Sequence, residues 1–229
     1  MESLNRLIRV LGSPTEVFKS AKEAPKLFIP ILVVTLLMTG TMAYYSFNVD
    51  AAAIIEKGIE LSGRADQIPA DRMEQIVNAQ SKVMKYSIPG GTLIMMPIVL
   101  FLMGLYFYIM GKIMGGEANY GQSTAIVVYA QGPTLIWIVV ALAIMFMGDF
   151  STTLQQDLIP SNLAYFLDPE TVGRKLHALA YSIDFFKIWQ AILMILGFSV
   201  MTESKLSKSA AVVLVPWALI VAISLLFVR

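Results

Sequence analysis

Five stretches of the chain are long and apolar enough to cross a bilayer as helices. A transmembrane helix needs about 20 such residues to span roughly 30 Å of hydrocarbon. The shortest stretch has 17 residues and carries Lys187 and Gln190 in its first turns, but a lysine near a helix end can extend to the interface. The pattern predicts an all-α polytopic membrane protein, with a cytosolic amphipathic segment over 1–26 and one five-helix membrane domain over 27–229. The predicted spans are 27–47, 92–110, 125–147, 185–201 and 210–228.

The segment before the first span has an apolar stripe of its own. Its first eleven residues place leucines and an isoleucine on one helical face, and Ser13 with Pro14 begins a second short helix. Lys19, Lys22 and Lys26 flank this second helix. A basic amphipathic segment next to a membrane span is typical of one that lies on the anionic inner leaflet, which is our expectation. The alternative is a solvated tail without packing contacts.

The two long connections, 48–87 and 148–184, also contain helical patterns, and both are too long to be structureless. The first holds AAAIIEKGIEL and DRMEQIVNAQSKVMKY, and the second holds DPETVGRKLHALAYSI, with Asp168 as its cap. Each pattern carries an apolar stripe. We expect these helices to cover the ends of their own bundle, and the alternative is that they dock on a partner.

Composition agrees with a chain that lies mostly in lipid. Hydrophobic residues make up 57% of the 229 residues and charged residues 14%, whereas soluble domains have about 45–50% and about 25%. The net charge of +1 does not indicate a nucleic-acid partner. With the N-terminus inside, the inner segments hold eight Lys/Arg in 47 residues and the outer segments eight in 78, Lys187 apart. This difference predicts a cytoplasmic N-terminus and an outside C-terminus.

The residues that could support catalysis do not form a recognisable active site. The chain has no cysteine and one histidine, His177, which excludes disulfides, thiolate metal sites and any site that needs two histidines. Ser199 lies about a membrane's thickness from His177 and cannot use it as a base. Asp149 and Asp184 share the outer side, so an intramembrane aspartyl enzyme is a third alternative. We expect no enzyme, no cofactor and no bound metal.

The third span contains an unusual polar interruption, the sequence from Tyr129 through Gln131 and Gly132 to Pro133. Proline frees the carbonyl of Tyr129 and is expected to kink the helix. Gln131 can donate to the freed carbonyl or to a neighbouring helix, and Gly132 lets that neighbour approach closely. We interpret these residues as helix-packing or partner-contact residues. The alternative is that Gln131 lines a substrate path.

The start of the fourth span supplies the remaining candidate contact residues. Asp184 and Lys187 are three residues apart on a helix and can pair, and Trp189 lies where amphipathic rings prefer the membrane interface. No carboxylate falls near the centre of a span, which argues against proton- or sodium-coupled transport. A uniporter or a flippase-like groove stays possible on this evidence.

The order of these motifs resembles the Yip domain family, five-helix membrane proteins named after the Rab-GTPase-interacting Yip proteins of the secretory pathway. A proline-marked amphipathic segment precedes span one, NYGQSTAIVVYAQGP introduces span three, and the basic turn ESKLSKSAA leads into the last span. YAQGP, from Tyr129 to Pro133, resembles the family's tyrosine-to-proline pattern in the third helix. DFFKIW, from Asp184 to Trp189, resembles the start of helix four in bacterial members. The resemblance covers nearly the whole chain.

This resemblance implies a cytosolic N-terminus and an outside C-terminus, in agreement with the charge distribution. The chain has no clear match to the acidic glycine-proline motif of eukaryotic members and lacks their long cytosolic N-terminal region, so a Rab-type GTPase is not an expected partner. The resemblance implies a multi-pass protein of a prokaryotic plasma membrane (the bacterial inner membrane). Such members resemble accessory membrane proteins, some of them linked with ABC-type export systems.

These observations together favour a non-catalytic membrane adaptor or scaffold, accessory to an export (ABC-type) or trafficking complex. The expected partners are membrane lipids and other membrane proteins, among them ABC-type exporter subunits or a second copy of the chain. The alternative is a small membrane carrier or lipid-handling protein with a cavity at the third-helix kink. A continuous polar cavity that reaches mid-membrane would favour the alternative.

Overall fold

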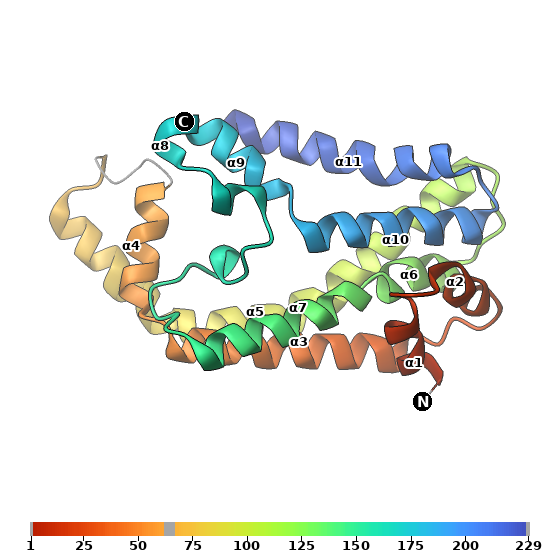
Figure 1. Cartoon of the computed structure of the whole chain (residues 1–229), viewed down its shortest axis with the longest axis horizontal. Helices are drawn as coiled ribbons and strands as arrows, with labels where there is room; N and C mark the ends of the chain where they lie inside the picture. The colour runs from red at the N-terminus through yellow and green to blue at the C-terminus, as the bar shows by residue number, and fades with distance from the viewer. Residues whose placement is uncertain (1, 62–66, 228–229) are drawn as a thin grey trace.

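The computed structural model, which describes residues 2–61 and 67–227, is a bundle of helices (Figure 1). Five segments are long and apolar enough to cross a membrane: Phe28–Asn48, Ala70–Ile113, Tyr120–Met147, Phe185–Thr202 and Leu206–Leu226. The predicted all-α fold with five transmembrane helices is therefore confirmed. The elements are α1 (Glu2–Arg9), α2 (Pro14–Glu23), α3 (Phe28–Asn48), α4 (Ala51–Leu61), α5 (Ala70–Ile113), α6 (Tyr120–Tyr129), α7 (Gly132–Met147), η2 (Gln155–Asp157), η3 (Leu163–Phe166), α8 (Pro169–Val172), α9 (Arg174–Ser182), α10 (Phe185–Thr202) and α11 (Leu206–Phe227).

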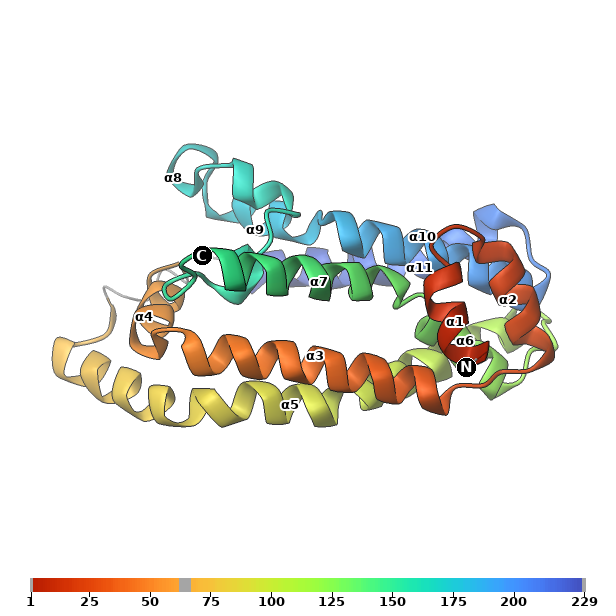
Figure 2. The same cartoon turned by 60° about the horizontal axis from the view of Figure 1, so that its bottom comes forward.

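The long helices run roughly along one axis (Figures 1 and 2). Helices α1 and α2 lie at one end of this axis, together with the α5–α6 loop and the α10–α11 turn, and we call this the N-terminal end. Helices α4, α8 and α9 lie toward the opposite end. In both views α10 begins about halfway along α7, so residues 148–184 occupy space beside the outer half of α7. This offset makes room for the candidate site described below.

The second span differs from its sequence-based prediction. We expected a separate helix within 48–87 and a span over 92–110, but α5 is one helix of 44 residues that includes both. At 1.5 Å per residue it is about 66 Å long, roughly twice the hydrocarbon thickness. Pro89 and Pro97 lie inside it without ending it. Prolines are tolerated within transmembrane helices, which is why the residue pattern misplaced this boundary.

The opposite end of the bundle is covered by the chain's own connections. Ile54 of α4 and Phe150, Leu154 and Leu158 after α7 form one buried cluster with Tyr45 at the end of α3. The Tyr45 hydroxyl donates to the carbonyl of Thr153 at 2.8 Å. These segments therefore cover the ends of α3 and α7, as we expected for α4, whereas α9 of the second connection leaves Leu176 50% exposed.

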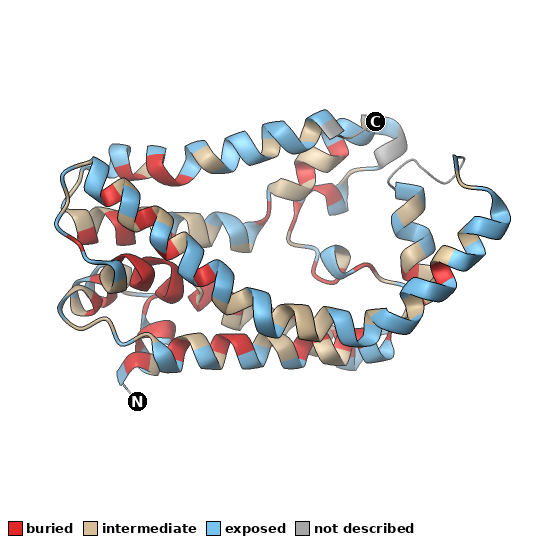
Figure 3. Cartoon of the chain, turned by 180° about the vertical axis from the view of Figure 1, so that it is seen from behind, coloured by how far each residue is buried: buried red, intermediate tan, exposed pale blue. Residues whose placement is uncertain are grey.

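The N-terminal segment does not have the lipid-facing stripe that we expected, nor is it a solvated tail. Leu7, Val10, Phe18 and Ala21 are fully buried in the protein, within the core cluster at the N-terminal end (Figure 3). Helix α2 packs on α10 and α6. A Cβ atom on Gly197 of α10 would lie 2.9 Å from the Phe18 ring, so the absent side chain leaves the space that the ring fills. An amphipathic stripe can face either lipid or protein. Here it packs against protein, where Gly197 leaves room for Phe18.

A buried arginine fixes this segment in place. Arg6 is only 4% exposed, and its guanidinium donates to the carbonyl of Ala24 and the hydroxyl of Ser20, both at 2.7 Å, and to Glu2 at 2.9 Å. A buried charge is costly unless it is hydrogen-bonded in this way. Arg6 thus ties α1 to α2 and to the linker before α3.

Close contact between α5 and α6 provides a test of this packing. A Cβ atom on Gly104 would lie 2.9 Å from the Cα atom of Thr124, whereas Gly40 of α3 has nothing within 4 Å. We expect Gly104→Ala to force the two helices apart and to lower the free energy of unfolding by about 1–3 kcal/mol. Gly40→Ala should be neutral or slightly stabilising because alanine favours helix. Thermal unfolding in detergent measures both, and equal effects of the two substitutions would contradict the packing.

Candidate functional site

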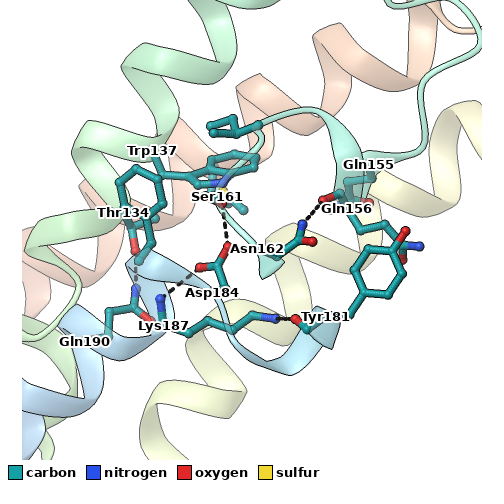
Figure 4. Close-up of a pocket in the computed structure, with 13 residues that line it drawn as sticks. Thr134, Trp137, Gln155, Gln156, Ser161, Asn162, Tyr181, Asp184, Lys187 and Gln190 are labelled. Atoms are coloured by element: carbon teal, nitrogen blue, oxygen red, sulfur yellow. Dashed lines mark hydrogen bonds between the residues drawn. The ribbon is translucent and has the colours of Figure 1, made fainter. Parts of the chain in front are cut away.

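A polar cavity of about 520 Å³ lies between α3, α7, α9, α10 and the connection after α7 (Figure 4). We call it the polar recess. Most of its hydrogen-bonding side chains are carboxamides and hydroxyls, and its apolar wall comes from α3, α7 and the start of α10. The lining residues are Met38, Thr134, Trp137, Gln155, Gln156, Ile159, Ser161, Asn162, Tyr181, Asp184, Phe186, Lys187 and Gln190.

Hydrogen bonds between two spans form the floor of the polar recess. The Gln190 amide of α10 donates to the Thr134 hydroxyl at 2.7 Å and to the Gln131 carbonyl oxygen at 3.4 Å. The Thr134 hydroxyl in turn donates to the same Gln131 oxygen at 2.9 Å. Three side chains therefore satisfy one another at the point where the third span is interrupted.

The interruption is a break between two helices rather than a kink within one. Helix α6 ends at Tyr129, and α7 begins at Gly132 with Pro133 in its first turn. Proline is tolerated there because a backbone N–H in the first turn of a helix has no intrahelical acceptor. The Gln131 amide donates to the carbonyl of Val127 in α6 at 3.4 Å, and not to the carbonyl of Tyr129 or to a neighbouring helix, the two acceptors that we expected. The break explains this choice of acceptor. The backbone N–H of Gln131 donates to Val128, so the carbonyl of Val127 lacks its usual helical partner.

The other candidate residues of the third span face the N-terminal segment. A Cβ atom on Gly132 would lie 2.8 Å from the carbonyl oxygen of Leu7 and 2.5 Å from a methyl group of Val10, so α1 is the neighbour that approaches here. Tyr129 is fully buried, and its hydroxyl donates to the carbonyl of Lys26 at 2.8 Å. Pro133 is buried beside them. Among these residues, Gln131 alone contacts the lining of the recess, through its hydrogen bonds with Thr134 and Gln190.

At the start of α10, the recess wall depends on Asp184. Its carboxylate accepts from the backbone N–H of Lys187 at 3.0 Å and from the Ser161 hydroxyl, so it caps the helix and holds the preceding connection. The expected side-chain pair with Lys187 is replaced by this backbone cap. The Lys187 ammonium instead donates to the carbonyl of Tyr181 at 3.4 Å. Trp189 does not line the recess, and its ring lies 5.6 Å from that of Phe185.

Tyr181 lines both the polar recess and a second cavity of about 620 Å³. Burial raises the pKa of Tyr181 to about 12, and the hydrogen bond to Asp157 at 2.9 Å adds to this rise, so the hydroxyl is a neutral donor. Asp149 and His177 line the second cavity, whereas Asp184 lines the recess. The two aspartates of the aspartyl-enzyme alternative thus lie in different cavities.

The recess is equipped to bind polar groups. Its Ser161 donates to a carboxylate that already caps a helix, an arrangement that holds structure rather than activating a nucleophile. Across residues 2–61 and 67–227, no three His, Cys, Asp or Glu side chains are grouped to hold a metal ion. Thr134, Gln190, Ser161 and Asn162 were not predicted as site residues. Gln190 had a usable signal, because it is a second carboxamide within a span.

Comparison with known proteins identifies the family of the chain. The family model of the Yip1 domain matches residues 8–228, nearly the whole chain. The chain belongs to the Yip1 domain family. This Yip1-domain protein is 22% identical over 195 residues to membrane protein YknW of Bacillus subtilis (strain 168), a match that covers 83% of the chain and 76% of the relative. No solved structure gave a significant match.

The cap at Asp184 can be tested with two substitutions at one position. Asp184→Ala should remove the acceptor of both the Lys187 N–H and the Ser161 hydroxyl, and lower the free energy of unfolding by about 1–2 kcal/mol. Asp184→Asn should stay close to the wild type, because asparagine caps helices about as well as aspartate. Thermal unfolding in detergent at neutral pH is the measurement. A loss with Asn as large as that with Ala would mean that charge, and not the cap, holds this wall.

Proposed function

We propose that this Yip1-domain protein is a non-catalytic membrane adaptor that receives a polar segment of a partner in the polar recess. The observation that carries the proposal is that carboxamide and hydroxyl side chains line much of the recess, while hydrogen bonds between α7 and α10 form its floor. Docking needs access from one side only. A carrier, in contrast, must expose its site to each side in turn.

Dense packing behind the floor supports this reading. Val127 and Val128 lie just before the break, Ala130 lies in it, and all three are buried. The N-terminal segment packs against the same stretch from the other side, through Leu7 and Val10. A partner could therefore occupy the recess without any movement of the N-terminal end.

We further propose a prokaryotic plasma membrane as the location, with the N-terminal end in the cytoplasm and the C-terminus outside. The concentration of Lys/Arg in the inner segments supports this orientation. In that orientation the recess lies toward the outer side, among residues of the 148–184 connection and the start of α10. Other membrane proteins are the proposed partners, with ABC-type exporter subunits and a second copy of the chain as the first to examine.

A small carrier or lipid-handling protein is the second candidate function, because the recess reaches the break in the third span. The carboxamides of Gln131 and Gln190 meet there, from two different membrane-spanning segments. Polar groups at such a depth often mark a substrate path. This candidate requires the N-terminal end to open.

Substitutions in the floor distinguish the two functions. Gln190→Leu removes a lining amide, and Gln131→Leu removes its partner from behind. If the protein is an adaptor, each of these two substitutions should weaken its complex with a partner. A loss of about 1.4 kcal/mol of binding free energy would reduce recovery of the native complex roughly tenfold after gentle detergent extraction. Gln80→Leu makes the same chemical change at an exposed position of α5 and should leave recovery unchanged.

Solute flux into proteoliposomes that contain the protein alone provides the opposing measurement. An adaptor should give no flux above that of empty liposomes, for the wild type and for all three variants. Flux by the wild type that Gln190→Leu abolishes, with complexes recovered intact, would replace the adaptor by the carrier.

A further inference from the structure

A separate cavity lies at the N-terminal end, where α2 stands beside the end of α10. Its volume is about 420 Å³, and we call it the basic pocket. Helix α2 contributes two lysines, the last turn of α10 contributes a serine and a valine, and the α10–α11 turn contributes a glutamate and a serine. The lining residues are Lys19, Lys22, Ser199, Val200, Glu203 and Ser204.

The charges around the basic pocket leave cations unpaired. The Lys22 ammonium lies 2.7 Å from the Glu203 carboxylate and also donates to the carbonyl of Val200 at 3.3 Å. Its hydrogen bond holds the pKa of Glu203 below the usual value, so this pair is internally neutral. Lys19 is exposed and forms no ion pair with any residue of 2–61 or 67–227.

Two more exposed lysines, Lys205 and Lys208, follow the pocket in the α10–α11 turn and the first turn of α11. With Glu23 of α2 counted, four lysines stand against two glutamates around this turn. The excess is positive, and it is presented by flexible side chains that can adapt to an anion.

The serines make the wall of the pocket rigid. The Ser199 hydroxyl donates to the carbonyl of Ser204 at 2.7 Å, and the Ser204 hydroxyl lies 3.0 Å from that of the fully buried Ser209. These hydroxyls fix the turn, so the lysines remain as the groups available to a ligand. The ligand would therefore be recognised by charge.

The position of the pocket indicates the source of that ligand. One candidate span ends at Thr202 and the next begins at Leu206, so the pocket lies at the membrane boundary of both. Leu206 is 54% exposed, next to the lysines, and offers an apolar contact on the membrane side. Lipid phosphates lie at this level, and basic residues there gain from an anionic surface.

We propose that the basic pocket binds the phosphate-bearing headgroup of an anionic membrane lipid. The inference depends on the membrane placement of α10 and α11 and not on the proposed adaptor function. The lysines supply the charge, the turn supplies a fixed wall, and the exposed leucine lies along the acyl chains. A lipid held here would connect α2 to the end of α10.

The full-length protein in detergent is the material for the test, with phosphatidylglycerol and phosphatidylcholine offered in equal amounts. Native mass spectrometry counts the lipids that stay bound. The wild type should retain phosphatidylglycerol in excess. Each lysine removed should weaken this preference roughly fivefold, so Lys19→Gln with Lys205→Gln should lower it about 25-fold.

The matched control removes two exposed lysines from the opposite end, Lys82→Gln with Lys175→Gln. It should keep the wild-type preference. Glu203→Gln should strengthen the preference, because it releases the Lys22 ammonium from its ion pair. This variant keeps the proposal testable if loss of lysines disturbs folding.

Three results would overturn the proposal. The first is equal binding of the two lipids by the wild type, and the second is equal loss in the control and the pocket variants. The third is complete displacement by millimolar inorganic phosphate, which would indicate a site for the free anion. Because partner recovery is not measured, the adaptor proposal can fail while this one stands, and the reverse is also true.

Discussion

The structure depends on how the break in the third span satisfies its backbone in a medium without water. An unpaired carbonyl in hydrocarbon costs several kcal/mol, so a helix cannot be interrupted there unless other groups take over its hydrogen bonds. The Gln131 amide donates to the carbonyl of Val127, and its oxygen accepts from Thr134 and Gln190, which hold the amide in this position. Because Gln190 belongs to α10, the repair of one helix also positions another. The break thereby joins two spans through side chains rather than through close backbone contact.

The same break separates two environments. On one side, Gly132 and Tyr129 receive the N-terminal segment, which fills the N-terminal end with buried apolar side chains. On the other side, α10 begins only halfway along α7, and the connection after α7 occupies the remaining space with polar groups (Figures 2 and 4). A continuous third helix would provide neither the packing position for α1 nor the hydrogen bonds at the floor of the polar recess. A short polar sequence thus organises both ends of the protein.

The number and type of the spans could be predicted because the length of an apolar run is set by the bilayer alone. The boundary of α5 could not, since Pro89 looks like a helix end in sequence but is tolerated inside this helix. The sequence could not show whether the apolar stripe of the N-terminal segment faces lipid or protein, because both environments favour the same residue pattern. At the site, Gln131 and Asp184 were recognisable as polar residues in or beside apolar runs. Ser161 and Asn162 were not, because only the tertiary fold brings their irregular connection against α10.

The packing of the N-terminal end bears directly on whether the polar recess can open through the membrane. Leu7, Val10 and Phe18 are fully buried, and the burial of such a side chain contributes about 1.5–3 kcal/mol. Displacement of the three would therefore cost on the order of 5–9 kcal/mol, before the hydrogen bonds of Arg6 and Tyr129 are counted. Alternative conformations that a protein visits unaided usually lie within a few kcal/mol of the ground state. A path through this end would thus need free energy from outside the chain, whereas occupation of the recess alone needs no movement of this end.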